Sequence, residues 1–152
     1  MWREAQPEDD DVVATLCLML NHEDPGPAVV TDQQVRRTLE ELRSNPIRGK
    51  ALVLDISGRL VGYALLISFW SNELGGEVCT VDEIFVAPEE RGHGHATALL
   101  QSLDDAWNRP LVATSLEISP TNERAAALYR RLGFEGSNTV LARRSQNSKA
   151  VE

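Results

Sequence analysis

The chain has 152 residues, of which 42% are hydrophobic, and its 23 acidic and 15 basic side chains give a formal net charge of −8. This length suits one domain with its own core, and the longest apolar stretches, 60–67 and 79–87, are too short to span a bilayer. The negative charge disfavours nucleic acid as a partner, because phosphate backbones are bound by cations, and it would attract cationic small molecules instead.

The cysteines and the first residues bear on the compartment. Cys17 and Cys79 form neither a closely spaced pair nor the disulfide framework of a secreted protein, and both lie in apolar segments. Met1 is followed by Trp2-Arg3-Glu4, without the charged-then-apolar order of a signal peptide. We therefore expect a cytoplasmic protein with reduced thiols and no membrane partner.

The first half of the chain predicts two helices between short strands. The predicted segments are a strand over 1–5, a helix over 8–20, a loop over 21–27, a helix over 31–45 and strands over 51–56 and 60–69. Thr31 is placed to cap the second helix, which must end before Pro46. Ser57-Gly58 joins the two strands as a hairpin signal.

The second half predicts a strand–helix–strand crossover after a polar turn. Its segments are a turn over 70–76, a strand over 77–87, a helix over 95–107, a strand over 111–118, a helix from 120 to the αL cap Gly133, and a strand over 139–142. We predict an α/β fold with a mixed, mostly antiparallel sheet, helices on both faces and a central βαβ unit. One domain is expected over 1–144, with a disordered polar tail over 145–152.

The junction between the predicted strand at 77–87 and the following helix indicates a phosphate site. It reads Arg91-Gly92-His93-Gly94-His95-Ala96. Two glycines allow positive φ and a close backbone approach, and the free N–H groups of a helix start favour an anion. A Walker-type site would need Gly-Lys-Ser/Thr here, and a Rossmann site would need three glycines on an opening βαβ unit. Neither pattern is present.

A resemblance follows from the order of motifs around this junction. The strand ends Val86-Ala87-Pro88, Arg91-x-x-Gly94-x-Ala96 opens a helix, and Asn122, Ala126-Leu128-Tyr129 and Gly133-Phe134 follow the next strand. Over about 52–134 the chain resembles the GCN5-related N-acetyltransferase (GNAT) superfamily. The resemblance implies that fold, acetyl-CoA as co-substrate, and acetyl transfer to a primary amine of a small molecule, as in polyamine-type members.

The resemblance also implies which residues bind the coenzyme. The backbone N–H groups of Gly92, His93, Gly94, His95 and Ala96 would bind the pyrophosphate, and Arg91 would enter the same turn. Phe85 and Val86 would offer backbone groups to the pantetheine arm, which lies beside the strand like an added strand. Asn122 would hydrogen-bond the arm from the other side.

Acetyl transfer to an amine poses two proton problems. An alkylamine is nearly all ammonium at neutral pH and must lose a proton before it attacks, and the thiolate that leaves must gain one. The family motif implies Tyr129 as the acid beside the coenzyme sulfur. Asp82 and Glu83 are candidate bases, because acids are costly in mid-strand; they alternate in direction, so one should face the site, and Glu83 is favoured.

Two alternatives stay open for the function as a whole. The acceptor could be a protein lysine or N-terminus, or the chain could be a regulatory module that binds acetyl-CoA without turnover.

No metal is expected, because a metal would need three ligands to converge and His93 and His95 belong to the phosphate turn, with His22 far away in sequence. Dimers are common in such families, so the resemblance allows a homodimer.

Overall fold

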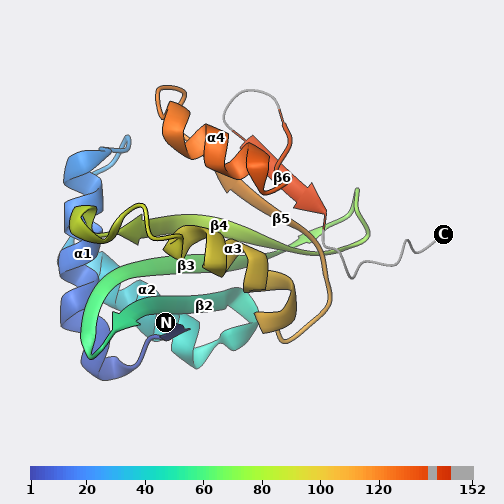
Figure 1. Cartoon of the computed structure of the whole chain (residues 1–152). Helices are drawn as coiled ribbons and strands as arrows, with labels where there is room; N and C mark the ends of the chain where they lie inside the picture. Colours follow the sequence, from blue (N-terminus) through green and yellow to red (C-terminus); the bar gives the residue numbers. More distant parts are fainter. Residues whose placement is uncertain (137–139, 145–152) are drawn as a thin grey trace. The chain divides into compact units, whose positions relative to one another are not determined.

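The computed structural model describes residues 1–136 and 140–144. The strands are β1 (Trp2–Glu4), β2 (Gly49–Ile56), β3 (Arg59–Ser71), β4 (Gly76–Val86), β5 (Leu111–Glu117) and β6 (Val140–Arg144) (Figure 1). The helices are α1 (Asp10–Glu23), α2 (Asp32–Ser44), α3 (His95–Ala106) and α4 (Glu123–Arg131). None of the helices in the described ranges is long and apolar enough to cross a membrane.

Within the described residues, the strands form one six-stranded sheet in the order β1-β2-β3-β4-β5-β6. β1 pairs with β2 and β5 pairs with β6 in antiparallel fashion. β4 and β5 are parallel, and α3 lies between them in sequence, which is the strand–helix–strand crossover predicted above. The predicted α/β class with a mixed sheet is confirmed.

The chain divides into two compact units, which we describe separately. The first unit comprises Met1–Leu66 and Glu83–His95. The second comprises Ile67–Asp82 and the part of the chain that follows His95. The predicted single domain over 1–144 remains a prediction, and the predicted disordered tail over 145–152 lies outside the described residues.

In the first unit, α1 and α2 lie beside one another and α2 contacts β2 (Figure 1). Thr31 caps α2 as predicted: its side-chain oxygen accepts from the Gln34 N–H, and the Gln34 side chain accepts from the Thr31 N–H in return. The Arg43 guanidinium at the end of α2 binds the Asp10 carboxylate at the start of α1 at 2.7 and 2.8 Å. This ion pair links the C-terminal end of α2 to the N-terminal end of α1.

Two local features of the first unit bear on the site. Ser57 and Gly58 both have positive φ, 54° and 85°, which confirms the predicted hairpin between β2 and β3. α1 continues to Glu23, into the predicted loop at 21–27, and the Asp24 N–H still bonds the Leu20 carbonyl. The helix therefore carries Glu23 at its last position.

The second unit places β5 between β4 and β6. Buried Leu99, Leu100 and Leu103 give α3 its apolar face, as its spacing predicts. α4 ends at Arg131, and Gly133 follows two residues later with φ of 86°, which confirms the predicted αL cap. The final strand runs over Val140–Arg144, beyond the predicted 139–142, and Thr139 lies outside the described residues.

Candidate active site

The predicted phosphate turn follows β4 and leads directly into α3. Gly92 has φ 82° and Gly94 has φ 80°, so both adopt the left-handed conformation that their identity suggested. A Cβ atom placed on Gly94 would find no other atom within 4 Å. Because the first four N–H groups of an α-helix have no intrahelical partner, the start of α3 at His95 adds free donors to an open turn.

The Arg91 guanidinium is held on three sides within the first unit. Its Nε donates to the Val86 carbonyl at 2.8 Å, and its two terminal nitrogens donate to the Glu23 carboxylate at 2.8 Å each. Its Cζ lies 5.4 Å from the centre of the Phe85 ring. The pair lowers the pKa of Glu23 and raises that of Arg91, mainly through these hydrogen bonds. Arg91 thus ties the start of the turn to β4 and α1, with its charge matched by Glu23.

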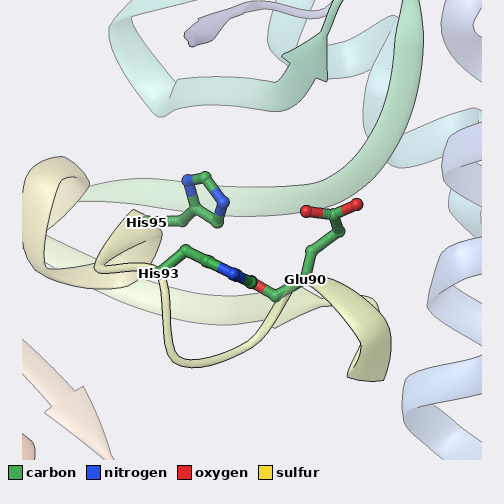
Figure 2. A group of neighbouring side chains, drawn as sticks. All are labelled: Glu90, His93 and His95. Atoms are coloured by element: carbon green, nitrogen blue, oxygen red, sulfur yellow. The ribbon is translucent and has the colours of Figure 1, made fainter.

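Three potential metal ligands meet at the same turn (Figure 2). Ligand atoms of Glu90, His93 and His95 all lie within 4.8 Å of one another. The His93 ring lies across the turn with Nδ1 3.0 Å from the Glu90 carbonyl oxygen, and the two imidazole centres are 6.0 Å apart. Only histidines were weighed as metal ligands from the sequence, so Glu90 is a third potential ligand that the sequence did not predict.

Glu83, the favoured candidate base, contacts two buried side chains that were not predicted to lie at the site, Tyr63 and Cys17. The Tyr63 hydroxyl donates to Glu83 Oε2 at 3.0 Å, and Cys17 Sγ lies 3.9 Å from the same oxygen. Burial raises the pKa of Tyr63 and raises that of Cys17 to about 12. Both groups therefore keep their protons at neutral pH, so both can act as donors to this carboxylate.

Asp82, the other candidate base, has different surroundings in the second unit. Its side chain is exposed, and its pKa is raised by desolvation and, to a lesser extent, by the negative charge of Glu117. It has none of the donors that surround Glu83. The two neighbouring acids therefore differ chemically, as the alternation of a strand predicts.

Tyr129 lies in α4 and Asn122 is its N-cap residue, both in the second unit. Tyr129 is buried with its ring centre 5.9 Å from that of Phe134, and burial raises the pKa of its hydroxyl. Over 1–136 and 140–144 the structure gives this hydroxyl no hydrogen-bond partner. The Asn122 side-chain oxygen caps α4 by accepting from the Ala125 N–H at 3.1 Å, which is a structural role beside the predicted contact with the coenzyme.

Comparison with known proteins gives matches at the level of sequence and fold. Residues 16–134 match the sequence profile of the acetyltransferase (GNAT) family. An uncharacterized N-acetyltransferase of Methanocaldococcus jannaschii is 36% identical over 90 residues, which are 58% of this chain and 40% of that protein. The chain thus spans less than half the length of this curated relative.

Solved structures with this fold include two acetyltransferases. The ribosomal-protein-alanine N-acetyltransferase from Brucella melitensis superposes with a TM-score of 0.78 at 20% identity, covering 95% of this chain and 99% of that one. A predicted acetyltransferase from Clostridium acetobutylicum, solved with acetyl-CoA, gives a TM-score of 0.73 at 17% identity and covers 91% of each chain. The profile match over residues 16–134 confirms the family resemblance found in the sequence, and the superpositions confirm its fold.

Proposed function

Because this chain belongs to the acetyltransferase (GNAT) family, we propose that it transfers acetyl from acetyl-CoA to a primary amine of a small molecule by direct attack. The observation that carries the proposal is the turn before α3. Gly92 and Gly94 hold it open in the left-handed conformation, and nothing in the described residues fills the space beside Gly94. Such a turn suits a diphosphate, because helix-start N–H groups bind anions.

Coenzyme binding uses the backbone more than charged side chains. The N–H groups of residues 92–96 bind the diphosphate. The Arg91 guanidinium is already paired with the Glu23 carboxylate, so its role is to hold the turn in place. The backbone of Phe85 and Val86 serves the pantetheine arm, with Asn122 as a further polar contact. This arrangement fits acetyl-CoA without requiring a cationic surface, in agreement with the acidic chain.

The proton transfers are assigned to Glu83 and Tyr129. Glu83, directly or through one water, first takes a proton from the ammonium group of the substrate. The neutral amine nitrogen then forms a bond to the thioester carbonyl carbon. The carbon–sulfur bond breaks, the departing sulfur takes the Tyr129 proton, and the second proton lost by the nitrogen restores the Tyr129 hydroxyl. Tyr63 supports the assignment of Glu83, because its hydroxyl orients one carboxylate oxygen. Asp82 is the alternative base, and its raised pKa would favour proton uptake.

The acceptor class rests on charge. An amine substrate arrives mostly as a cation. The chain has a net charge of −8 and its candidate base is a carboxylate, so it attracts cations. Polyamines, amino acids and aminated drugs are the small molecules that fit. Cys17 and Cys79 are buried thiols outside any disulfide, which is consistent with a reducing compartment, and the cytoplasm is the proposed location. A homodimer remains compatible with the proposal.

A thiol-release assay tests the proposed function. Acetyl-CoA is incubated with the full chain and a panel of polyamines, amino acids and aminated drugs, and free coenzyme A is followed with a thiol reagent. We expect turnover with at least one small amine. Turnover only with peptides that carry a lysine or a free N-terminus would assign a protein acceptor instead. Acetyl-CoA binding without any turnover would make the chain a regulatory module.

A further inference from the structure

Glu90, His93 and His95 gather on one turn that the acetyl transfer does not explain in full. Glu90 ends the short 3-10 turn at Pro88–Glu90, His95 begins α3, and His93 lies between two glycines of positive φ. These glycines bend the chain so that the three side chains converge (Figure 2). We propose that the three residues bind a divalent transition-metal ion such as Zn²⁺ or Ni²⁺, and that this ion and acetyl-CoA exclude each other at the turn.

The donor set suits these ions in kind and number. Imidazole nitrogens and a carboxylate oxygen are ligands of Zn²⁺ and Ni²⁺, whereas Mg²⁺ and Ca²⁺ take oxygen donors. Ligand atoms around Zn²⁺ lie roughly 3.3 Å apart when the bonds are about 2.0 Å long in a tetrahedral site. The three ligand atoms are already within 4.8 Å of one another, and side-chain rotation at exposed His93 can bring them closer. Three protein ligands leave one position for water.

The charges around the cluster also favour a cation. Arg59 binds Oε1 of Glu90 and lies 3.7 Å from a carboxylate oxygen of Glu89. One guanidinium therefore faces two carboxylates, and the group keeps a net negative charge. Because Arg59 takes Oε1 of Glu90, Oε2 is the atom available to a metal ion. His93 and His95, on either side of Gly94, each offer one ring nitrogen as a ligand.

Mutual exclusion follows from the position of the ligands, and this part of the inference rests on the proposed function. His93 and His95 flank Gly94, whose open side is where the diphosphate is proposed to bind. A metal ion bound to both imidazoles draws them together across that opening. The ion would therefore close the turn to acetyl-CoA, and bound acetyl-CoA would hold the imidazoles apart. Free metal would lower the affinity for acetyl-CoA, and hence the activity at low coenzyme concentration.

Calorimetric titration of Zn²⁺ into the full chain, in a weakly coordinating buffer, tests the metal site. We expect one site whose affinity falls at least about tenfold when His93→Gln and His95→Gln are combined. Glu90→Gln should weaken it to a smaller extent. His22→Gln is the matched control, because His22 is the one histidine of the chain outside the proposed site and lies far from it in sequence. Equal Zn²⁺ affinity in the wild type and the double variant would overturn the site.

A second titration separates the metal site from the proposed function. Acetyl-CoA is used as the probe, because its sulfur is acylated and cannot bind Zn²⁺ as a thiolate. With Zn²⁺ at ten times its Kd, competition raises the Kd of acetyl-CoA about tenfold relative to the same titration with EDTA. An unchanged Kd would overturn mutual exclusion. Failure of acetyl-CoA to bind even with EDTA would contradict the proposed function and leave the Zn²⁺ titration as a valid test of the site.

Discussion

The hydroxyl of Tyr63 donates a hydrogen bond to Oε2 of Glu83 at 3.0 Å, although the two residues lie on different strands. Tyr63 is fully buried, so its hydroxyl has little access to water and holds the carboxylate in one orientation. We expect Tyr63→Phe to lower kcat/KM for the amine about tenfold, since a hydrogen bond to a charged group contributes about 1.5–3 kcal/mol. Steady-state kinetics with a varied amine measures this.

A double-mutant cycle distinguishes positioning from mere stability. If Tyr63 acts through Glu83, Tyr63→Phe has no further effect on turnover in the Glu83→Gln background. The acetyl-CoA affinity should stay the same in all three variants. Additive losses of kcat/KM across the cycle would show that Tyr63 acts independently of this carboxylate.

Glu83 and Asp82 should respond unequally to neutralisation. Glu83 has two protonated donors within reach, whereas Asp82 is exposed and faces the negative charge of Glu117. We expect Glu83→Gln to lower kcat/KM about a hundredfold, which is the usual scale of general base catalysis, and Asp82→Asn to lower it less than about threefold. The reverse ranking would assign the base to Asp82, and two negligible effects would assign it to water.

Tyr129→Phe should lower kcat about tenfold while the acetyl-CoA Kd remains unchanged. The raised pKa of this buried hydroxyl keeps it protonated throughout the neutral range, as an acid that protonates the departing sulfur requires. Separate measurements of kcat and of acetyl-CoA binding by calorimetry check this. An unchanged kcat would remove the acid role and leave Tyr129 as a core residue packed on Phe134.

The pair of Arg3 and buried Asp9 makes a prediction about stability and pH. The Arg3 guanidinium binds both Asp9 oxygens at 2.7 and 3.0 Å, and this hydrogen bonding lowers the pKa of Asp9. A depressed carboxyl pKa stabilises the fold above the unfolded pKa near 3.9, and the contribution disappears as the pH falls through the folded value. We expect Asp9→Asn to reduce the free energy of unfolding by about 2 kcal/mol at pH 7.

Urea denaturation at several pH values checks the sign of this effect. The difference between wild type and Asp9→Asn should shrink as the pH falls below about 4, because the unfolded chain then binds the proton before the folded Asp9 carboxyl does. Asp32→Asn is the control, because Asp32 also binds an arginine, Arg36, but on an exposed helix surface. It should leave the free energy of unfolding nearly unchanged, because solvent screens an exposed pair. A difference for Asp9→Asn that is as large at pH 2 as at pH 7 would contradict the pairing.

Local signals predicted the elements, while the contacts within the site depend on long-range pairing. A helix cap, a hairpin and a helix end were predicted from the backbone geometry that particular residue types favour, at Thr31, Ser57-Gly58 and Gly133. The structure confirms all three predictions. Periodicity carries no such information about the pair of Tyr63 and Glu83. The sequence did offer one signal: counting residues outward from the turn between β3 and β4 places Tyr63 and Glu83 near one another on neighbouring strands.

The pair of Glu23 and Arg91 shows the second limit of sequence reasoning. Arg91 was expected to enter the phosphate turn, and nothing in its local sequence indicated that an acid 68 residues away would take up its guanidinium. That acid is available only because α1 extends to Glu23, past the predicted end of the helix. Charge matching across such a separation depends on how helices and strands pack, which local propensity does not encode.

The affinity of two matched glycine variants for acetyl-CoA tests the central claim most directly. Gly94 and Gly58 have φ near 80° and 85°, and a Cβ on either would meet no atom within 4 Å, so Gly94→Val and Gly58→Val carry similar backbone strain. We predict that both variants fold, that Gly58→Val binds acetyl-CoA like the wild type in calorimetry, and that Gly94→Val loses detectable binding. Wild-type affinity in folded Gly94→Val would contradict a diphosphate site at this turn.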